Sequence, residues 1–373
     1  MQNFQFPAVA IVLVNYRGWR ETIECIDTVL AQDYPSFQVF VVDNDSDDQS
    51  LERIAAWCER PRRDPLWRDL PGVPHLSVTG GGVSIRYRRA DRDDGVLPEA
   101  PAGCLLTLVD AGANLGYAGG CNVGMAAAGR AAFDFFWLLN TDTVVDPNAL
   151  RELVMRAVAD PAVGMVGSTL RLYGRPMEIQ ALAGARVSRR MLITRQIGEG
   201  LLVGSPLPAA DAVERELAYV AGASMLVSCR FLQEVGPMQE DYFLYYEEFD
   251  WALRGAGRFR LAYAPASQVF HKVGATSAKA LRDFSMQLRY RNLVRFASRF
   301  FPERLALVRL GLVRTLLRYL AQGRWRGIRV VTGTLRDFDA LARSAAPGMT
   351  VPPPVGTARS RPLPIALRVR RGG

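Results

Sequence analysis

The chain has 373 residues, 49% of them hydrophobic and 22% charged, which is enough for a sizeable core and too much for a single small domain. Its net charge of +9 is uneven, because the segment 282–373 holds nineteen arginines, no lysine and four acidic residues, a charge of +15 that leaves −6 on the residues before it. We therefore expect a large α/β body, either as one domain with an appendage or as two domains. The cationic extension suits nucleic acid or an anionic membrane surface.

The cysteines and the hydropathy of the chain indicate the cellular compartment in which we expect the protein. The five cysteines are scattered and include no CxxC pair, which favours reduced thiols in a cytoplasmic protein over a disulfide framework. The N-terminal stretch MQNFQFPAVAIVLVNY has no basic region and its apolar run has only the length of a strand, so we expect no signal peptide. No window of about 18 uncharged apolar residues occurs, so we expect no membrane-spanning helix.

The first sixty residues predict the start of a parallel sheet. AVAIVLVNY at 8–16 is a continuous apolar run, typical of a strand buried on both faces, and residues 19–32 have the apolar spacing of a helix. FQVFVVD at 37–43 predicts a second buried strand, and LERIAAWCER at 51–60 predicts a second helix. Strands and helices that alternate in this way predict a parallel sheet covered by helices.

The pattern breaks at 61–103 and then resumes. This proline-, glycine- and charge-rich stretch is interpreted as an insertion with room for one hairpin, and His75 within it as a lone surface histidine. Residues 104–128 predict a strand, a glycine-rich turn and a small-residue helix. Further strands and helices are predicted at 134–142, 149–160, 163–172 and 217–236, helices at 281–345, and a disordered tail at 346–373.

Polar residues end two of the predicted strands. Because ligands of open α/β sheets bind beyond the carboxyl ends of the strands, Asp43 could accept hydrogen bonds from a base or a ribose, or it could simply cap the next helix. Asn140 and Asp142 offer the oxygen ligands that Mg²⁺ and Mn²⁺ prefer, and a cation there would hold a diphosphate. The same Asn-Thr-Asp sequence is also common in turns.

Two further segments have a chemical and a structural interpretation. NLGYAGGCNVG at 114–124 lets the backbone approach a phosphate, although it lacks the ending of a P-loop; the alternative is a tight, closely packed turn. In YYEEFDWALR at 245–254 the two glutamates adjoin aromatic residues, a setting that raises a carboxylate pKa and suits proton abstraction; the alternative is a solvated helix start. Asp250 and Arg254 have the spacing of a helical ion pair. His271, at the end of an apolar strand, is either a metal ligand or a core histidine.

The order of these segments carries a resemblance that no single segment does. IVLVNY, an acid after the second strand, NLGYAGGCNVG, LLNTD, AGASMLV, YYEEFDW.LR and H..G follow one another over residues 8–275. In this the chain resembles family 2 glycosyltransferases, in particular their bacterial rhamnosyltransferase-like branch. The resemblance implies an A-type glycosyltransferase fold, a Rossmann-like mixed α/β sheet covered by helices, in residues 1–280, followed by the helical, arginine-rich extension 281–345.

The same resemblance implies an activity. It is the inverting transfer of a sugar from a dTDP- or UDP-linked donor to a glycan or a polyprenyl-diphosphate-linked saccharide in cell-surface polysaccharide synthesis, with Mg²⁺ or Mn²⁺ as cofactor. In such a single displacement one base deprotonates the acceptor while the nucleoside diphosphate departs. Two other functions stay open. A sugar-phosphate nucleotidyltransferase should carry a glycine-rich basic loop after the first strand, which NYRGWRET matches poorly; the other is a non-catalytic sugar-nucleotide-binding protein.

Residue by residue, the resemblance places Glu248 as the catalytic base, with Glu247 or Asp250 as alternatives. Asn140 and Asp142 stand in place of a D-x-D pair, and His271 can complete the metal site. Because Asn140 is neutral, Asp142 should carry most of the metal binding. The donor-binding residues expected on this basis are Asn15, Tyr16, Asp43, Asn44, Asn114, Gly116, Tyr117, Gly120, Asn122, Asn140 and Asp142, and the acceptor-cleft residues are Gly222, Ala223, Trp251 and Arg254.

The extension has its own pattern. Helical spacing places Arg304, Arg309, Arg314 and Arg318 in a loose stripe beside apolar residues, which suits a helix lying in a membrane interface. The alternative is a helical cap packed on the body. We expect peripheral association with the inner face of the cell membrane. Nucleic-acid binding is not expected, because no recognised module is present.

Overall fold

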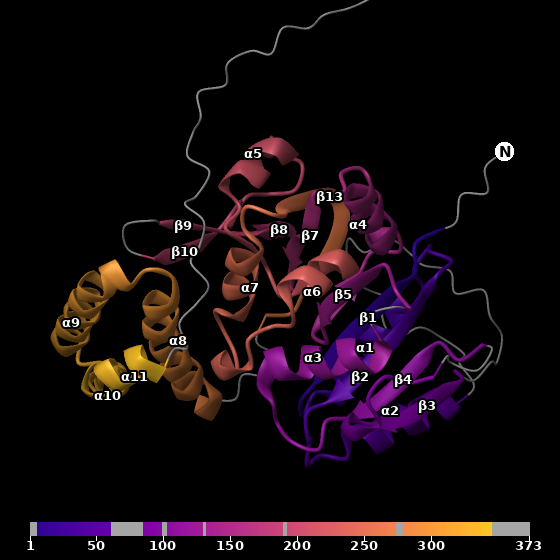
Figure 1. Ribbon diagram of the computed structural model, residues 1–373, viewed down its shortest axis with the longest axis horizontal. Coiled ribbons are helices and arrows are strands. Elements are labelled where there is room, and N and C mark those ends of the chain that lie inside the picture. Colours follow the sequence, from indigo (N-terminus) through magenta and orange to yellow (C-terminus); the bar gives the residue numbers. More distant parts are fainter. Residues whose placement is uncertain are drawn as a thin grey trace, which may run out of the picture.

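The computed structural model describes residues 6–60, 85–98, 103–129, 132–188, 192–273 and 279–344. Most of the insertion expected at 61–103, His75 included, and the tail expected at 346–373 lie outside these residues. The body contains a ten-stranded sheet with helices on both faces and a second, three-stranded sheet, and a group of helices lies beside it (Figure 1).

Five parallel strands form the first half of the sheet, in the order β3-β4-β2-β1-β5. Alternate residues of β1 enter two different cores: Ile11 packs with α1 and α2, whereas Val12 packs with α3. This two-sided burial is why the strand reads as an unbroken apolar run. The bounds are β1 Val9–Asn15, α1 Trp19–Val29, β2 Phe37–Asp43, α2 Ser50–Glu59, β3 Tyr87–Asp91, β4 Leu106–Asp110, α3 Gly116–Ala128 and β5 Phe135–Asn140, with a 3₁₀ turn at Arg92–Asp94.

The described part of the expected insertion contains a strand that the sequence did not predict. Residues 87–91, as β3, pair in parallel with β4 and extend the sheet by an edge strand. The hairpin expected within 61–103 stays untested, because most of that stretch lies outside the described residues. Exposed Arg89 and partly exposed Arg88 give this strand the charged surface of a sheet edge, which hides its strand character in the sequence.

The second half of the sheet is mixed. β12 runs antiparallel between β5 and β7, while β13 runs parallel to β7 and carries the short edge strand β6. The mixed α/β sheet that we expected is thus confirmed. The bounds are β6 Thr143–Val145, α4 Ala149–Val158, β7 Val163–Leu172, β8 Arg175–Leu182, β9 Gly184–Ser188, β10 Ile193–Gln196, α5 Ala210–Glu216, β11 Tyr219–Val220, β12 Ser224–Ser228, α6 Cys229–Val235, a 3₁₀ turn Glu240–Tyr242, α7 Glu247–Gly255 and β13 Arg260–His271.

The extension is helical, as expected, and it packs on the body through its first helix. Phe296 of this helix is buried, with its ring centroid 4.4 Å from that of Phe249 in α7. The other helices pack on α8 around a core that includes Val294, Leu312 and Val331, together with Leu192 of the body. No described helix has both the length and the apolar character needed to cross a membrane. The bounds are α8 Lys279–Phe300, a 3₁₀ turn Pro302–Arg304, α9 Leu305–Ala321, α10 Trp325–Arg336 and α11 Phe338–Ser344.

Candidate active site at the strand ends

One edge of the sheet gathers most of the expected site residues. Asn15 ends β1 directly beside Asp43 at the end of β2, and Asn140 ends β5 on the other side of β1. The Asn140 N–H donates to the carbonyl of Ala223 at 3.2 Å, which brings the turn before β12 to the same edge. The carboxyl ends of parallel strands therefore meet the start of an antiparallel one here, where ligands of open α/β sheets bind.

Asp43 is a buried carboxylate that accepts three hydrogen bonds from neighbouring residues. It accepts from the Ser46 N–H at 2.9 Å, the Ser46 hydroxyl at 2.7 Å and the Asn15 amide. Thr22 donates its hydroxyl to Asn15 Oδ1 at 2.7 Å and so fixes the amide that faces Asp43. Burial raises the pKa of Asp43, although the donors from Ser46 and Asn15 oppose the rise. Asp43 thus shapes the turn after β2. Because a carboxylate has about four acceptor positions and three are taken, one position is left for a ligand.

The glycine-rich turn is shaped by close packing. Gly116 has φ +70°, and a Cβ there would collide with the carbonyl of Phe243. Its own carbonyl accepts from the Asn44 amide at 2.8 Å, which joins the turn to the end of β2. A Cβ at Gly120 would lie 2.6 Å from Val14 of β1. Asn114 is exposed and accepts the Gly116 N–H at 3.1 Å.

Tyr117 links this turn to Glu248. Its hydroxyl donates to the carbonyl of Gly222 at 2.7 Å, and its N–H donates to Phe243 O at 2.8 Å. The Gly222 N–H in turn donates to the carboxylate of Glu248. A Cβ at Gly222 would collide with Glu248 Oε1, so only glycine leaves room for this carboxylate. A continuous chain of contacts therefore runs from the end of β2 to the start of α7.

The two adjacent glutamates have different surroundings. Glu247 is 1% exposed, and its Oε2 has no hydrogen-bond partner among the described residues. Burial, and secondly the charge of Glu248, raise the pKa of Glu247 well above its usual range. Glu248 is partly exposed, and burial raises its pKa as well. Glu247 therefore keeps its proton to higher pH, and Glu248 is the carboxylate of the pair that solvent reaches.

Three expected site residues of α7 point into the protein instead. Asp250 is fully buried and accepts from Arg254 Nε at 2.7 Å, Arg299 Nη1 at 2.6 Å and the Tyr242 hydroxyl at 3.0 Å. The helical ion pair that we expected is thus confirmed, but Asp250 is a structural anion and not an alternative base. The guanidinium of Arg254 also donates to backbone carbonyls of the loop after α6. Trp251 is fully buried and donates its indole N–H to Gly236 O at 2.8 Å. Neither Arg254 nor Trp251 therefore lines an acceptor cleft.

Two expected donor-binding residues need separate comment. Asn122 is turned toward the loop after α6, where its amide donates to Met238 O at 2.9 Å and accepts the Met238 N–H at 3.0 Å. It ties α3 to that loop, so we no longer include it among the donor-binding residues. Tyr16 lies in the loop after β1, partly exposed, with the Arg17 guanidinium 5.1 Å from its ring centroid.

Asp142 and His271 form a pair at the tip of β5. His271 Nε2 lies 3.1 Å from Asp142 Oδ1, and its Nδ1 lies 3.0 Å from Gln180 Oε1 of β8. Burial acts to raise the pKa of Asp142, but His271 and Lys272 outweigh it, so the pKa is lowered and the carboxylate stays ionised. Among the described residues no cluster of three His, Cys, Asp or Glu side chains occurs, so any cation here would complete its shell with other oxygens.

The donor set of this pair fits a hard divalent cation. Gln180 can hold one ring nitrogen of His271 and leave Nε2 to face Asp142, which is how metal-binding histidines are oriented in proteins. Partly exposed Asn140 lies two residues before Asp142, and the Thr143 hydroxyl donates to its carbonyl at 2.7 Å, which closes the tip as a turn.

Sequence reasoning missed several contributors to the site. Gln180 reaches His271 only because β8 folds back on β7, a pairing for which the sequence holds no signal. The sequence did hold a signal that Asp250, Trp251 and Arg254 point into the protein. With Glu247 they occupy positions i, i+3, i+4 and i+7 of a helix, which is one face, and Glu248 lies outside that face.

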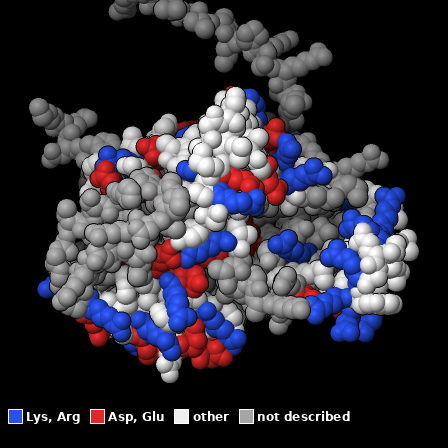
Figure 2. Space-filling model, turned by 180° about the vertical axis from the view of Figure 1, so that it is seen from behind, with Lys and Arg blue, Asp and Glu red and all other residues white. Residues whose placement is uncertain are grey.

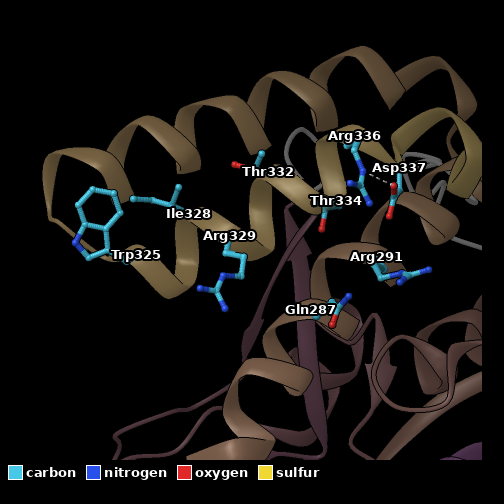
Figure 3. A pocket seen from close by; sticks show the side chains of 10 residues that line it. Gln287, Arg291, Trp325, Ile328, Arg329, Thr332, Thr334, Arg336 and Asp337 are labelled. Atoms are coloured by element: carbon cyan, nitrogen blue, oxygen red, sulfur yellow. Dashed lines mark hydrogen bonds and ion pairs between the residues drawn. The ribbon is translucent and has the colours of Figure 1, made fainter.

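A separate groove of about 630 Å³ lies in the extension, between α8 and α10 (Figure 3). No expected site residue lines it. Its lining is rich in arginine and includes the 76% exposed Trp325. The lining residues are Gln287, Arg291, Trp325, Ile328, Arg329, Thr332, Gly333, Thr334, Arg336 and Asp337.

Comparison with known proteins was made for sequence and structure. Residues 10–70 match the model of the family "Glycosyl transferase family 2". No curated protein matches the sequence. Among solved structures, mannosyltransferase PcManGT from Pyrobaculum calidifontis, in complex with GDP-Man and Mn²⁺, is 17% identical with a TM-score of 0.49, covering 90% of this chain and 76% of that one.

Two other solved structures are similar at a lower level. S. aureus TarS 1-349 is 12% identical with a TM-score of 0.45, covering 89% of this chain and 91% of that one. Glucosyl-3-phosphoglycerate synthase from Mycobacterium tuberculosis, in complex with Mn²⁺, UDP and glucosyl-3-phosphoglycerate, is 14% identical with a TM-score of 0.42, covering 76% of this chain and 78% of that one.

The matched segment can be placed on the fold. Residues 10–70 include most of β1 and all of α1, β2 and α2, and therefore contain Asn15 and Asp43. The mixed α/β sheet with its helices and the C-terminal helices agree with the fold that the sequence predicts. Over this segment the chain is similar to glycosyl transferase family 2.

Proposed function

We propose that this protein is a family 2 glycosyltransferase that moves a sugar, with inversion, from a nucleoside-diphosphate donor to a hydroxyl group of a glycan or a lipid-linked saccharide, with Glu248 as the base. The observation that carries the proposal is the Glu248 carboxylate, held on the Gly222 N–H at the same sheet edge as Asp43. A raised pKa brings a carboxylate closer to the operating pH, which strengthens it as a base while it remains ionised.

The donor half of the site is assigned to the strand ends. Asp43, with one acceptor position left, would accept an N–H of a uracil or thymine base, and Asn15 would hold it in place. Asp142 and His271 would hold Mg²⁺ or Mn²⁺, which when bound supplies positive charge to the diphosphate. The turn at Gly116 and Tyr117 connects the end of β2, through Asn44, to Gly222 beside Glu248.

The acceptor half is assigned to Glu248. Its carboxylate takes the proton of the attacking hydroxyl, while Gly222 holds it in place through the backbone N–H. Burial raises the pKa of neighbouring Glu247 well above its usual range, which favours its neutral form and limits repulsion between the two carboxylates. One carboxylate is sufficient, because a single displacement needs no covalent intermediate on the protein.

A panel of nucleotide sugars tests this proposal. The protein is incubated with dTDP- and UDP-linked sugars, rhamnose included, with Mg²⁺ or Mn²⁺, and the released phosphates are identified. We expect slow release of nucleoside diphosphate from one donor, faster when saccharide acceptors are added. Release of pyrophosphate from nucleoside triphosphate and sugar phosphate would instead indicate a nucleotidyltransferase, and donor binding without release a non-catalytic binding protein.

We further propose that the extension docks the protein on an anionic membrane, where a lipid-linked acceptor would be found. Large apolar side chains of α9 are exposed along one side of the helix. At about 100° per residue, Arg309 lies on one flank of this apolar stripe, and Arg314 and Arg318 lie on the other. In Figure 2 the basic side chains of the extension surround pale surface at the right of the molecule. The exposed apolar residues are Leu307, Leu310, Val313, Leu317 and Leu320, with Trp325 at the start of α10.

A further inference from the structure

The segment that leads into α7 has an unusual backbone. Phe243, Tyr245 and Tyr246 have φ angles of +64°, +73° and +78°, a region that residues other than glycine seldom occupy. Residues 242–246, called the base loop below, are followed directly by Glu247 and Glu248. Such a conformation persists only where the surroundings hold it, and it often lies at a functional site.

A side chain of the extension holds the base loop. Asn292 of α8 is fully buried, and its Nδ2 lies 2.8, 2.9 and 3.0 Å from the carbonyl oxygens of Tyr242, Leu244 and Tyr245. Because carbonyls only accept hydrogen bonds, the NH₂ group of the amide must face them, and its two hydrogens serve three acceptors. No aliphatic or acidic side chain could replace these donors.

Other residues of α8 contact the chain before, within and after the base loop. The Arg289 guanidinium lies 4.3 Å from the ring centroid of Tyr245, in the base loop. Arg295 donates to Asp241 O at 2.8 Å, just before the loop. Arg299 reaches Asp250 Oδ2 at 2.6 Å, in the helix after it. The extension therefore contacts the chain before, within and after the base loop.

The base loop also touches the donor side of the site. The carbonyl of Phe243 accepts the N–H of Tyr117 and lies against Gly116, which Asn44 joins to the end of β2. A shift of the loop would therefore move both Glu248 and the glycine-rich turn. The strained φ angles and the three carbonyl contacts make Asn292 the group that fixes its position.

We propose that Asn292 is a positioning residue for the transfer reaction. It acts from the extension through the base loop, which it holds in the conformation that sets the Glu248 carboxylate on Gly222. The proposal rests on the proposed function of Glu248 as base. It gives the extension a role in catalysis that is independent of any membrane.

The test compares Asn292→Asp, which keeps the shape but loses the donors, with Gln287→Ala, an exposed amide of the same helix. We expect Asn292→Asp to lower kcat by about tenfold or more, because small misplacements of a reacting group are costly, and to leave the Kd for nucleoside diphosphate within about twofold. The acidic limb of the kcat–pH profile should shift, since the carboxylate of Glu248 loses its fixed contact with Gly222. Gln287→Ala should match the wild type in all three measurements.

Two results would overturn the proposal: an unchanged kcat and pH profile in folded Asn292→Asp, or a loss of nucleotide binding as large as the loss of kcat. Should Asn292→Asp not fold, Arg289→Ala decides. It loosens Tyr245 from the protein surface, so a lower kcat with unchanged nucleotide affinity supports the proposal, and an unchanged kcat contradicts it. An active Glu248→Gln variant would refute the proposed base instead, whereas an inactive one beside a fully active Asn292→Asp would refute only the positioning role.

Discussion

Glu247 and Glu248 are neighbours in sequence, yet the helix gives them opposite environments. Glu247 turns inward, and its Oε2 finds no partner in the described part of the chain, while Glu248 rests on a backbone N–H and stays partly open to solvent. Two carboxylates with raised pKa values at one site are unusual in a stable core, because burial disfavours their charge. The pair therefore costs the folded protein stability at high pH, and that cost can be measured.

Glu247→Gln should stabilise the protein, increasingly as the pH rises. The pKa of Glu247 is raised in the folded state, so the protonated side chain supports folding fully below the unfolded pKa near 4.5, and this support is lost as the pH rises through the folded pKa. Each unit by which the folded pKa exceeds the unfolded one corresponds to about 1.4 kcal/mol at high pH. A glutamine keeps the neutral form at every pH.

Urea unfolding at pH 5 and pH 8 measures this effect. The difference in unfolding free energy between Glu247→Gln and wild type should be greater at pH 8 by about 1 kcal/mol or more. Glu199→Gln, at an exposed glutamate, should show no such dependence. A difference that is equal at both pH values, or smaller at pH 8, would show that Glu247 is ionised in the folded protein.

Part of the candidate site follows from strand ends, and part from the resemblance. The role of Glu248 as base is expected only from the resemblance, and that role stays a proposal. The positions of Asp43 and Asn140 could be predicted, because the carboxyl ends of apolar strands mark where ligands bind in such a sheet. The roles of Asp250 and Asn122 could not, because both depend on which distant backbone or side chain the helix faces. Ser46 and Thr22, which hold Asp43 and Asn15, have no signature beyond a common polar side chain.

At the scale of elements, the turn before β12 and the start of α7 form one unit. Gly222 is the contact point, since its N–H, its carbonyl and its missing side chain are all used by Tyr117 or Glu248. Close approach of two backbones with a carboxylate between them requires glycine. The sequence AGAS before an apolar run predicts a small-residue turn, but not that Glu248 would fill the space.

Gly222→Ala should therefore disable the site without unfolding the protein. The new Cβ would collide with the flexible end of Glu248 and lie 3.2 Å from Tyr117 Cε1, so the side chain of Glu248 moves and the backbone can stay. We expect kcat to fall by about 10- to 100-fold, with a melting temperature within a few degrees of wild type.

Gly174→Ala is the matched control, because a Cβ there meets no atom within 4 Å and the residue has no positive φ. It should keep kcat within about twofold, as expected of a surface substitution away from packed features. A Gly222→Ala enzyme as active as this control would mean that the Glu248 carboxylate does not work from the position that the structure shows.

Periodicity predicted most elements, and the failures have physical causes. β3 was not predicted, because a charged edge strand lacks the apolar run of a central strand. β9, β10 and α5 were not predicted, because their segment shows only weak hydrophobic periodicity. The base loop could not be predicted at all. Its positive φ angles at aromatic residues run against local preference and are held by Asn292 from a helix almost fifty residues away in sequence.

At the scale of the whole molecule, the extension has one side that packs on the body and another side that is exposed. The buried side of α8 holds the base loop, while α9 turns leucines and arginines to the surface. The packing of α8 on α7 agrees with the cap interpretation, while α9 lies on the outer side of the extension (Figure 1). Docking of α9 on a membrane stays a proposal.

Membrane docking predicts that charge and apolar contact act together. Sedimentation with vesicles of phosphatidylcholine plus about a third phosphatidylglycerol should pull down the protein, less at high salt, whereas pure phosphatidylcholine should not. Replacing Leu310 and Leu317 together by aspartate should reduce binding by about tenfold or more, because the apolar stripe is lost and the charge is lowered. Met155→Asp, on an exposed position of α4, is the control and should bind as wild type does. Equal binding of all three proteins would contradict docking through α9.

The most direct test of the account is turnover and donor binding measured together in Glu248→Gln. The account predicts that nucleoside-diphosphate release in the presence of acceptor falls by about 10²- to 10⁴-fold, as for other lost general bases, while the donor Kd stays within about twofold because Asp43 and Asp142 are untouched. A Glu248→Gln protein that still turns over its donor at close to the wild-type rate would contradict it.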